Sequence, residues 1–117
     1  MSIDHVLAVV PVSDVDRSER WYADLFGRAA DNNPMPTLVE WQLRPGAWLQ
    51  VFSDAARAGR GLFNFAVDDL ERHLAEVRAR GLQPGEILPV NKGVRLSELT
   101  DPDGNEIRII GGFRVEY

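Results

Sequence analysis

The apolar and polar positions along the chain alternate in two periods, one typical of strands and one typical of helices. Apolar runs rich in β-branched residues predict strands at 6–12, 37–43, 47–52, 62–67, 85–90, 93–99 and from about 106 to 110. The run at 6–12 is apolar without interruption, so we expect that strand to be buried on both faces. The segment at 28–36 is polar and contains proline, with room for one short strand.

Two segments have helical spacing, one from about 15 to 26 and one from about 70 to 80. In the second, Leu70, Leu74 and Val77 fall on one face. Good N-cap residues precede both segments, and a glycine follows each. The caps are Ser13 or Asp14 and Asp68 or Asp69, and the glycines are Gly27 and Gly81.

The predicted elements repeat in the order βαβββ, and a weak internal repeat supports the same division. Residues 11–17 align with 66–72, and in each half a glutamate precedes a turn glycine by six residues. We therefore predict an α+β domain of two βαβββ modules, at about 3–53 and 61–112. A polar linker separates them.

The repeat and the strand period together predict which side chains share a face. Counting from each turn glycine places Gln50 over Arg108, and Trp48 over Glu106. Because strand side chains alternate, Asn64 faces away from the three apolar positions at 63, 65 and 67. The apolar face should pack under the helices, so Asn64 should face a cleft. By the same alternation His5, Leu7 and Val9 look into that cleft.

The last hairpin turn carries a family resemblance. Residues 101–105 read Asp-Pro-Asp-Gly-Asn and precede a short apolar strand. This motif resembles the final hairpin of the vicinal oxygen chelate superfamily, which includes glyoxalase I, bleomycin-resistance proteins and extradiol dioxygenases. The resemblance covers nearly the whole chain. It implies that the two modules form a curved mixed sheet around a cleft, with the helices on the outer face.

The resemblance also implies four metal-ligand positions, which here are Leu7, Gln50, Leu62 and Arg108. Leucine cannot ligate a divalent ion, and an arginine places a cation where the ion would lie. We therefore expect no metal and no other cofactor. A displaced ion held by His5, Gln50 and Glu106 remains an alternative.

Arg108 has two interpretations, which the residues leave open. It forms a salt bridge, or a hydrogen bond to a carbonyl, across the cleft, or it anchors a carboxylate or phosphate group of a ligand. Trp48 and Trp41 either pack in the core or a dimer interface, or form an aromatic wall. The ligand-binding candidates are Arg108, Gln50, Asn64, Trp48 and His5. No set of residues for nucleophilic catalysis is recognisable, so the catalytic residues are unknown.

Composition narrows the function classes further. The net charge is −5 and the basic residues are scattered, which argues against binding to nucleic acid. The chain has no cysteine, which excludes a disulfide scaffold and a thiolate metal site. No apolar run approaches the ~20 residues of a membrane span, and the first residues do not read as a signal peptide. We therefore expect a soluble cytoplasmic protein.

The predicted function is a metal-independent small-molecule binding protein that sequesters an anionic or aromatic compound in its cleft. The alternative is an enzyme of the same superfamily, a lyase, isomerase or dioxygenase, with a displaced metal or none. A third class is an interaction protein whose cleft is filled by its own side chains. We also expect a homodimer, mostly from the resemblance. Four large aromatic residues are the local support: Trp41, Trp48, Phe113 and Tyr117.

Overall fold

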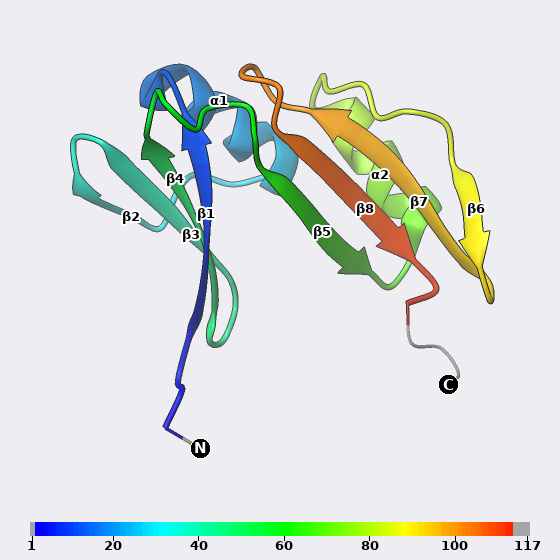
Figure 1. Cartoon of the computed structure of the whole chain (residues 1–117). Helices are drawn as coiled ribbons and strands as arrows, with labels where there is room; N and C mark the ends of the chain where they lie inside the picture. Colours follow the sequence, from blue (N-terminus) through cyan, green and yellow to red (C-terminus); the bar gives the residue numbers. More distant parts are fainter. Residues whose placement is uncertain (1, 114–117) are drawn as a thin grey trace.

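Two copies of a β-α-β-β-β unit follow one another along the chain (Figure 1). The computed structural model describes residues 2–113. The first module contains β1 (Val6–Val12), α1 (Val15–Phe26), β2 (Asn32–Met35), β3 (Leu38–Arg44) and β4 (Ala47–Ser53). The second contains β5 (Leu62–Val67), α2 (Leu70–Ala79), β6 (Leu88–Asn91), β7 (Val94–Thr100) and β8 (Glu106–Gly111).

Each module forms its own four-stranded sheet with the same topology. The strand orders are β1-β4-β3-β2 and β5-β8-β7-β6. The β1–β4 and β5–β8 pairs are parallel, and the other pairs are antiparallel. In Figure 1 the two sheets lie side by side, with both helices on the same side of the strands. The predicted fold class of two βαβββ modules is confirmed.

The register confirms the predicted internal repeat. Gln50 lies opposite Val9 on one neighbour and Glu40 on the other. In the second sheet Arg108 occupies the same place, between Asn64 and Glu98. The alignment that placed Gln50 over Arg108 therefore describes the actual sheets.

Aspartates cap both helices in the same way. The Asp14 carboxylate accepts a hydrogen bond from the Arg17 amide at 3.2 Å, and Asp69 accepts from the Arg72 amide at 3.0 Å. Of the cap residues that the sequence allowed, the second of each pair is therefore the one used. Gly27 ends α1 in the left-handed region at a φ of 75°, as predicted.

One face of each sheet packs under the helices, and the other is open. In β1, Val10 and Val12 are fully buried, whereas Leu7 and Val9 are 54% and 47% exposed. The prediction that this strand is buried on both faces is therefore wrong, because β1 is an edge strand with a helix on one side only. In β5 the apolar side chains at 63, 65 and 67 pack against the core, as predicted.

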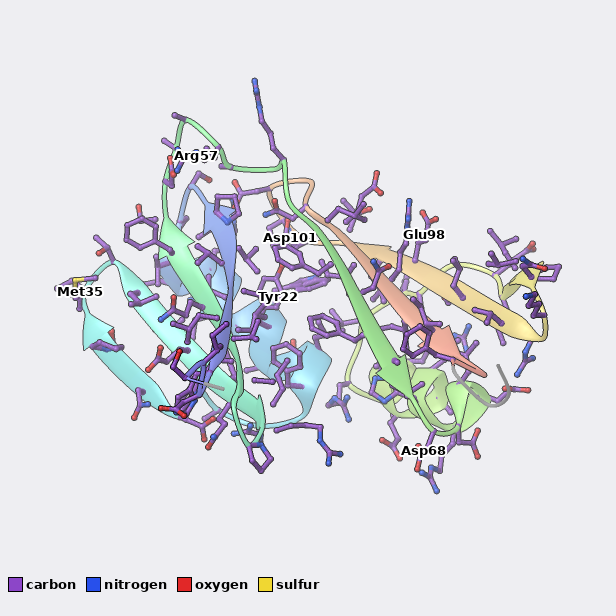
Figure 2. The ribbon with its side chains drawn as sticks, turned by 60° about the horizontal axis from the view of Figure 1, so that its bottom comes forward. Tyr22, Met35, Arg57, Asp68, Glu98 and Asp101 are labelled. Atoms are coloured by element: carbon purple, nitrogen blue, oxygen red, sulfur yellow. The ribbon has the colours of Figure 1, made fainter. Side chains whose placement is uncertain are left out.

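The Asp-Pro-Asp-Gly-Asn turn connects the two modules. The buried Tyr22 hydroxyl of α1 donates to Asp101 Oδ2 at 2.7 Å, and Figure 2 shows these residues next to each other between the sheets. Asn105 Nδ2 donates to the carbonyl of Pro11 in β1 at 2.9 Å. Burial, followed by the nearby Asp101 carboxylate, raises the pKa of Tyr22 well above its usual 10, so the phenol stays protonated and remains a donor.

A second connection between the modules lies at the ends of the helices. The Arg80 guanidinium, which follows α2, donates to the carbonyls of Asp24 and Leu25 in the last turn of α1. These carbonyls have no partner within their own helix, so the arginine supplies a C-terminal cap. The Phe26 and Phe65 rings also meet across the junction, with centroids 5.9 Å apart.

The outer edges of both sheets carry proline. Pro34 lies in β2 and Pro89 in β6, and both of these strands are exposed. Proline removes a backbone donor, so it protects an exposed edge from pairing with another strand. None of the helices within residues 2–113 is both long and apolar enough to cross a membrane.

Candidate functional site

The sheet faces opposite the helices, here called the open face, carry two separate pockets, which together contain three of the predicted site residues. The first pocket, of about 460 Å³, lies over the first sheet and is lined by Val9, Gln50, Phe52 and neighbouring side chains. The second, of about 360 Å³, lies over the second sheet and is lined by Asn64, Arg108 and mainly apolar side chains. Its apolar walls include Leu96 and Ile110.

The polar side chains that line the first pocket already have partners. Gln50 Nε2 donates to Glu40 Oε2 at 2.8 Å, and the other Glu40 oxygen accepts from Asn32 Nδ2 at 3.2 Å. Arg57 and Asp54 form an ion pair at 3.2 Å. This pocket therefore offers apolar surface and few free donors.

In the second pocket, by contrast, Arg108 has a donor without a hydrogen-bond partner among the described residues. Its Nε lies 3.7 Å from Glu98 Oε1, and a terminal nitrogen lies 3.7 Å from Glu106 Oε2. Both distances exceed that of a hydrogen bond. Nε is nevertheless buried and has no hydrogen-bond acceptor among the described residues. Buried donors normally have partners, so this N–H is an exception that a ligand acceptor would satisfy.

The carboxylates beside Arg108 also affect the charge of the pocket. The Arg108 side chain is 35% exposed, and those of Glu98 and Glu106 are 48% and 51% exposed. One cation beside two half-exposed carboxylates leaves a local charge near −1. Such pairs contribute little to stability because water screens them.

The structure thus brings together only part of the predicted ligand-binding set. Asn64 and Arg108 line the same pocket, whereas Gln50 lines the other. Trp48 Nε1 donates to His5 Nδ1 at 3.1 Å, and neither residue is among those lining the two pockets. Trp41 is fully buried and belongs to the core.

Sequence reasoning noted Glu40 and Glu98 only as evidence for the repeat, not as site residues. They lie directly opposite Gln50 and Arg108 on the neighbouring strands. Their shared position, six residues before a turn glycine, was the available signal. It places each glutamate on the same face as its partner, since directly paired residues point to the same side of a sheet.

The metal positions implied by the fold do not suit a metal. Leu7 and Leu62 offer no donor atom, and Arg108 is a cation. Within residues 2–113 no three His, Cys, Asp or Glu side chains gather in an arrangement that could hold an ion. Of the displaced set, His5 bonds to Trp48, Gln50 bonds to Glu40, and Glu106 lies beside Arg108.

The chain matches known proteins in both sequence and structure. Residues 2–109 match the Glyoxalase/Bleomycin resistance protein/Dioxygenase superfamily. The glyoxalase / bleomycin resistance protein from Catenulispora acidiphila DSM 44928 is 30% identical, with a TM-score of 0.85. The alignment covers 92% of this chain and 96% of that one.

Two further solved structures have the same fold. "Oxidase ChaP-H1" is 26% identical with a TM-score of 0.69, and the alignment covers 95% of both chains. TnmS3, an antibiotic binding protein from Streptomyces sp. CB03234, is 24% identical with a TM-score of 0.72, over 95% of this chain and 98% of that one. No curated protein sequence matches this chain. The family match spans nearly the whole sequence, and it agrees with the two βαβββ modules and the final turn: the chain belongs to the Glyoxalase/Bleomycin resistance protein/Dioxygenase superfamily.

Proposed function

We propose that this protein binds a small molecule in the pocket over the second sheet, without a metal. The observation that carries the proposal is Arg108 Nε, a buried donor with no acceptor among the described residues. Asn64, on the adjacent strand and in the same pocket, provides a second polar group close by. Apolar pockets with a few convergent polar groups are the usual form of small-molecule sites.

Of the anionic and aromatic compounds expected from the sequence, the charges around this pocket favour an aromatic one. A fully anionic ligand would approach Glu98 and Glu106 as well as Arg108. A ring with a carbonyl or phenolic oxygen can accept from Arg108 with less repulsion. Its ring would lie against apolar side chains such as Leu96 and Ile110.

Arg108→Met tests this role, because it keeps the bulk of the side chain and removes all its donors. We expect ligands found by screening aromatic carbonyl and phenolic compounds to bind the variant about ten- to hundredfold more weakly, which corresponds to about 1.5–3 kcal/mol. Isothermal titration calorimetry measures the affinity. Arg95→Met is the matched control: Arg95 is in the neighbouring strand, but it pairs with Glu71 of α2 at 2.7 Å.

The same two variants separate binding from stability. We expect both to melt near the parent temperature, because the carboxylates that lose their partner are half-exposed and can be hydrated. Unchanged affinity in Arg108→Met, or an equal loss in both variants, would contradict the proposed site. Conversion of the bound compound into a product would replace the binding function with the enzyme alternative.

We also propose that the chain forms a homodimer through its open face. Leu7, Val9 and Leu62 are each about half exposed there, and exposed apolar groups of this kind usually mark contacts. The aromatic residues that the sequence offered as evidence for a dimer give this proposal less support. Trp41 is buried, and Tyr117 lies outside the described residues.

Light scattering at micromolar concentration should give twice the mass of the chain. Leu62→Arg should shift the protein to the monomer mass, since it places a charge at the apolar contact. Ile3→Arg, at a residue 67% exposed and ahead of β1, should leave the dimer intact. A monomer mass for the parent protein would refute the dimer.

A further inference from the structure

A third pocket, here called the seam pocket, lies between the two modules. It has a volume of about 420 Å³. Its walls come from the end of α1 (Leu25 and Phe26), the end of β3 (Arg44), β5 (Phe65) and α2 (His73). The volume lies within the range of small-molecule sites, which often occur between domains or modules.

Most of the wall of the seam pocket is apolar. The Phe26 and Phe65 rings meet edge to face with centroids 5.9 Å apart, and Phe26 is also 5.5 Å from Trp41 in the core. Because β5 pairs only with β8, it is an edge strand, and its other edge has no ladder partner among the described residues. The pocket is therefore bordered by aromatic rings and by a strand edge with unpaired peptide groups.

The polar groups of the seam pocket differ in charge from those around Arg108. Arg44 is exposed and has no ion pair or side-chain hydrogen bond within residues 2–113, and no carboxylate lines the pocket. Arg108, by contrast, has two carboxylates at 3.7 Å. An anion would therefore meet a net positive charge in the seam pocket and a net negative charge at Arg108.

We propose that the seam pocket binds a small aromatic carboxylic acid, with its ring packed against Phe26 and Phe65 and its carboxylate on Arg44. The guanidinium fork suits a carboxylate, and no carboxylate side chain of the pocket wall competes for it. His73 also lines the pocket. Burial is the main cause that lowers the pKa of His73, so its ring is neutral at pH 7 and contributes a hydrogen bond rather than a charge.

This site is distinct from the one proposed on the open face. Asn64 and Ala66 line both pockets, but Arg44, Phe26 and His73 line only the seam pocket, and Arg108 lines only the other. The two proposals can therefore fail independently, since a seam variant leaves Arg108 in place and an Arg108 variant leaves Arg44 in place.

The test is a titration of the intact protein with 2-naphthoate, followed by two-dimensional amide NMR. We expect the largest shifts at Leu43, Arg44, Phe65 and His73, and small shifts at Leu96 and Arg108. Arg44→Gln should weaken 2-naphthoate about tenfold. Arg20→Gln removes another exposed charge, from α1 and outside the pocket, and should bind like the parent.

The uncharged isostere 2-naphthamide checks that the charge is responsible. It should bind the parent and Arg44→Gln with similar affinity. Ala47→Phe, which fills the pocket from the start of β4, should abolish binding of both compounds while thermal melts report that the variant is folded. Shifts centred on Leu96 and Arg108, no shift at millimolar 2-naphthoate, or equal affinity in Arg44→Gln and the parent would each overturn the proposal.

Discussion

Replacing Asp101 with alanine is expected to lower the free energy of unfolding by about 3–5 kcal/mol. The Asp101 side chain is buried and accepts from the Tyr22 hydroxyl at 2.7 Å. It also accepts from the amides of Asp103 and Asn105 and from Asn105 Nδ2, at 2.8–3.0 Å. Alanine would leave these buried donors without an acceptor, and each such group costs about 1–3 kcal/mol before the site relaxes. Urea unfolding measures the change.

Asp68→Ala is the matched control, since the Asp68 side chain is 86% exposed and forms a surface ion pair with Arg72. It should change stability by less than about 0.5 kcal/mol. Tyr22→Phe should cost about 1–2 kcal/mol by removing one of the donors. Added to Asp101→Ala, it should cost less than it does alone, because the hydroxyl has already lost its acceptor. A strictly additive double variant would show that the two modules are not coupled through this bond.

Gly59→Ala is expected to lower the free energy of unfolding by about 2–5 kcal/mol. Gly59 lies in the linker between the modules at a φ of 84°, where a side chain is strained by about 1–2 kcal/mol. A Cβ atom there would also lie 2.3 Å from the carbonyl oxygen of Asp103. Overpacking against backbone typically adds about 1–3 kcal/mol. Thermal and urea unfolding of the variant measure the sum.

Gly81→Ala isolates the backbone contribution. Gly81 has a φ of 97°, and a Cβ atom there would meet nothing within 4 Å. We expect it to cost only about 1–2 kcal/mol. If both glycine variants lost the same stability, the close approach of the linker to the turn would contribute nothing.

The positions of Gln50 and Arg108 were predictable from sequence because they depend on local rules. Strand side chains alternate with a period of two, and each turn glycine marks a point from which the last strand of the module can be counted. The internal repeat then transferred the count from one module to the other. The same local logic placed the helix caps, since Asp14 and Asp69 act on amides three residues away.

The exposure of Leu7 and Val9 was not predictable in this way. An uninterrupted apolar run is equally consistent with a strand covered on both faces and with an edge strand that leaves one apolar face exposed. What decides between them is the other elements that lie nearby, and in this chain a helix covers one face only. For the linker, the sequence indicated only that it is polar. The close approach of Gly59 to the turn at Asp103 was not predictable, because it joins residues far apart in sequence.

For the site itself, local pattern and tertiary arrangement contributed different parts. Alternation and the repeat placed Asn64 and Arg108 on one face, and the structure places them on adjacent strands. Whether Gln50 joins them depends on how the two sheets lie relative to each other, and in this chain it lines a separate pocket. The carboxylates beside Arg108 and the seam pocket also arise only from packing between strands and modules. The alternation of strand side chains and the turn residues were therefore enough to predict the elements and which side chains share a face. The charge around Arg108 and the cavities depend on contacts between residues far apart in sequence, which local patterns do not predict.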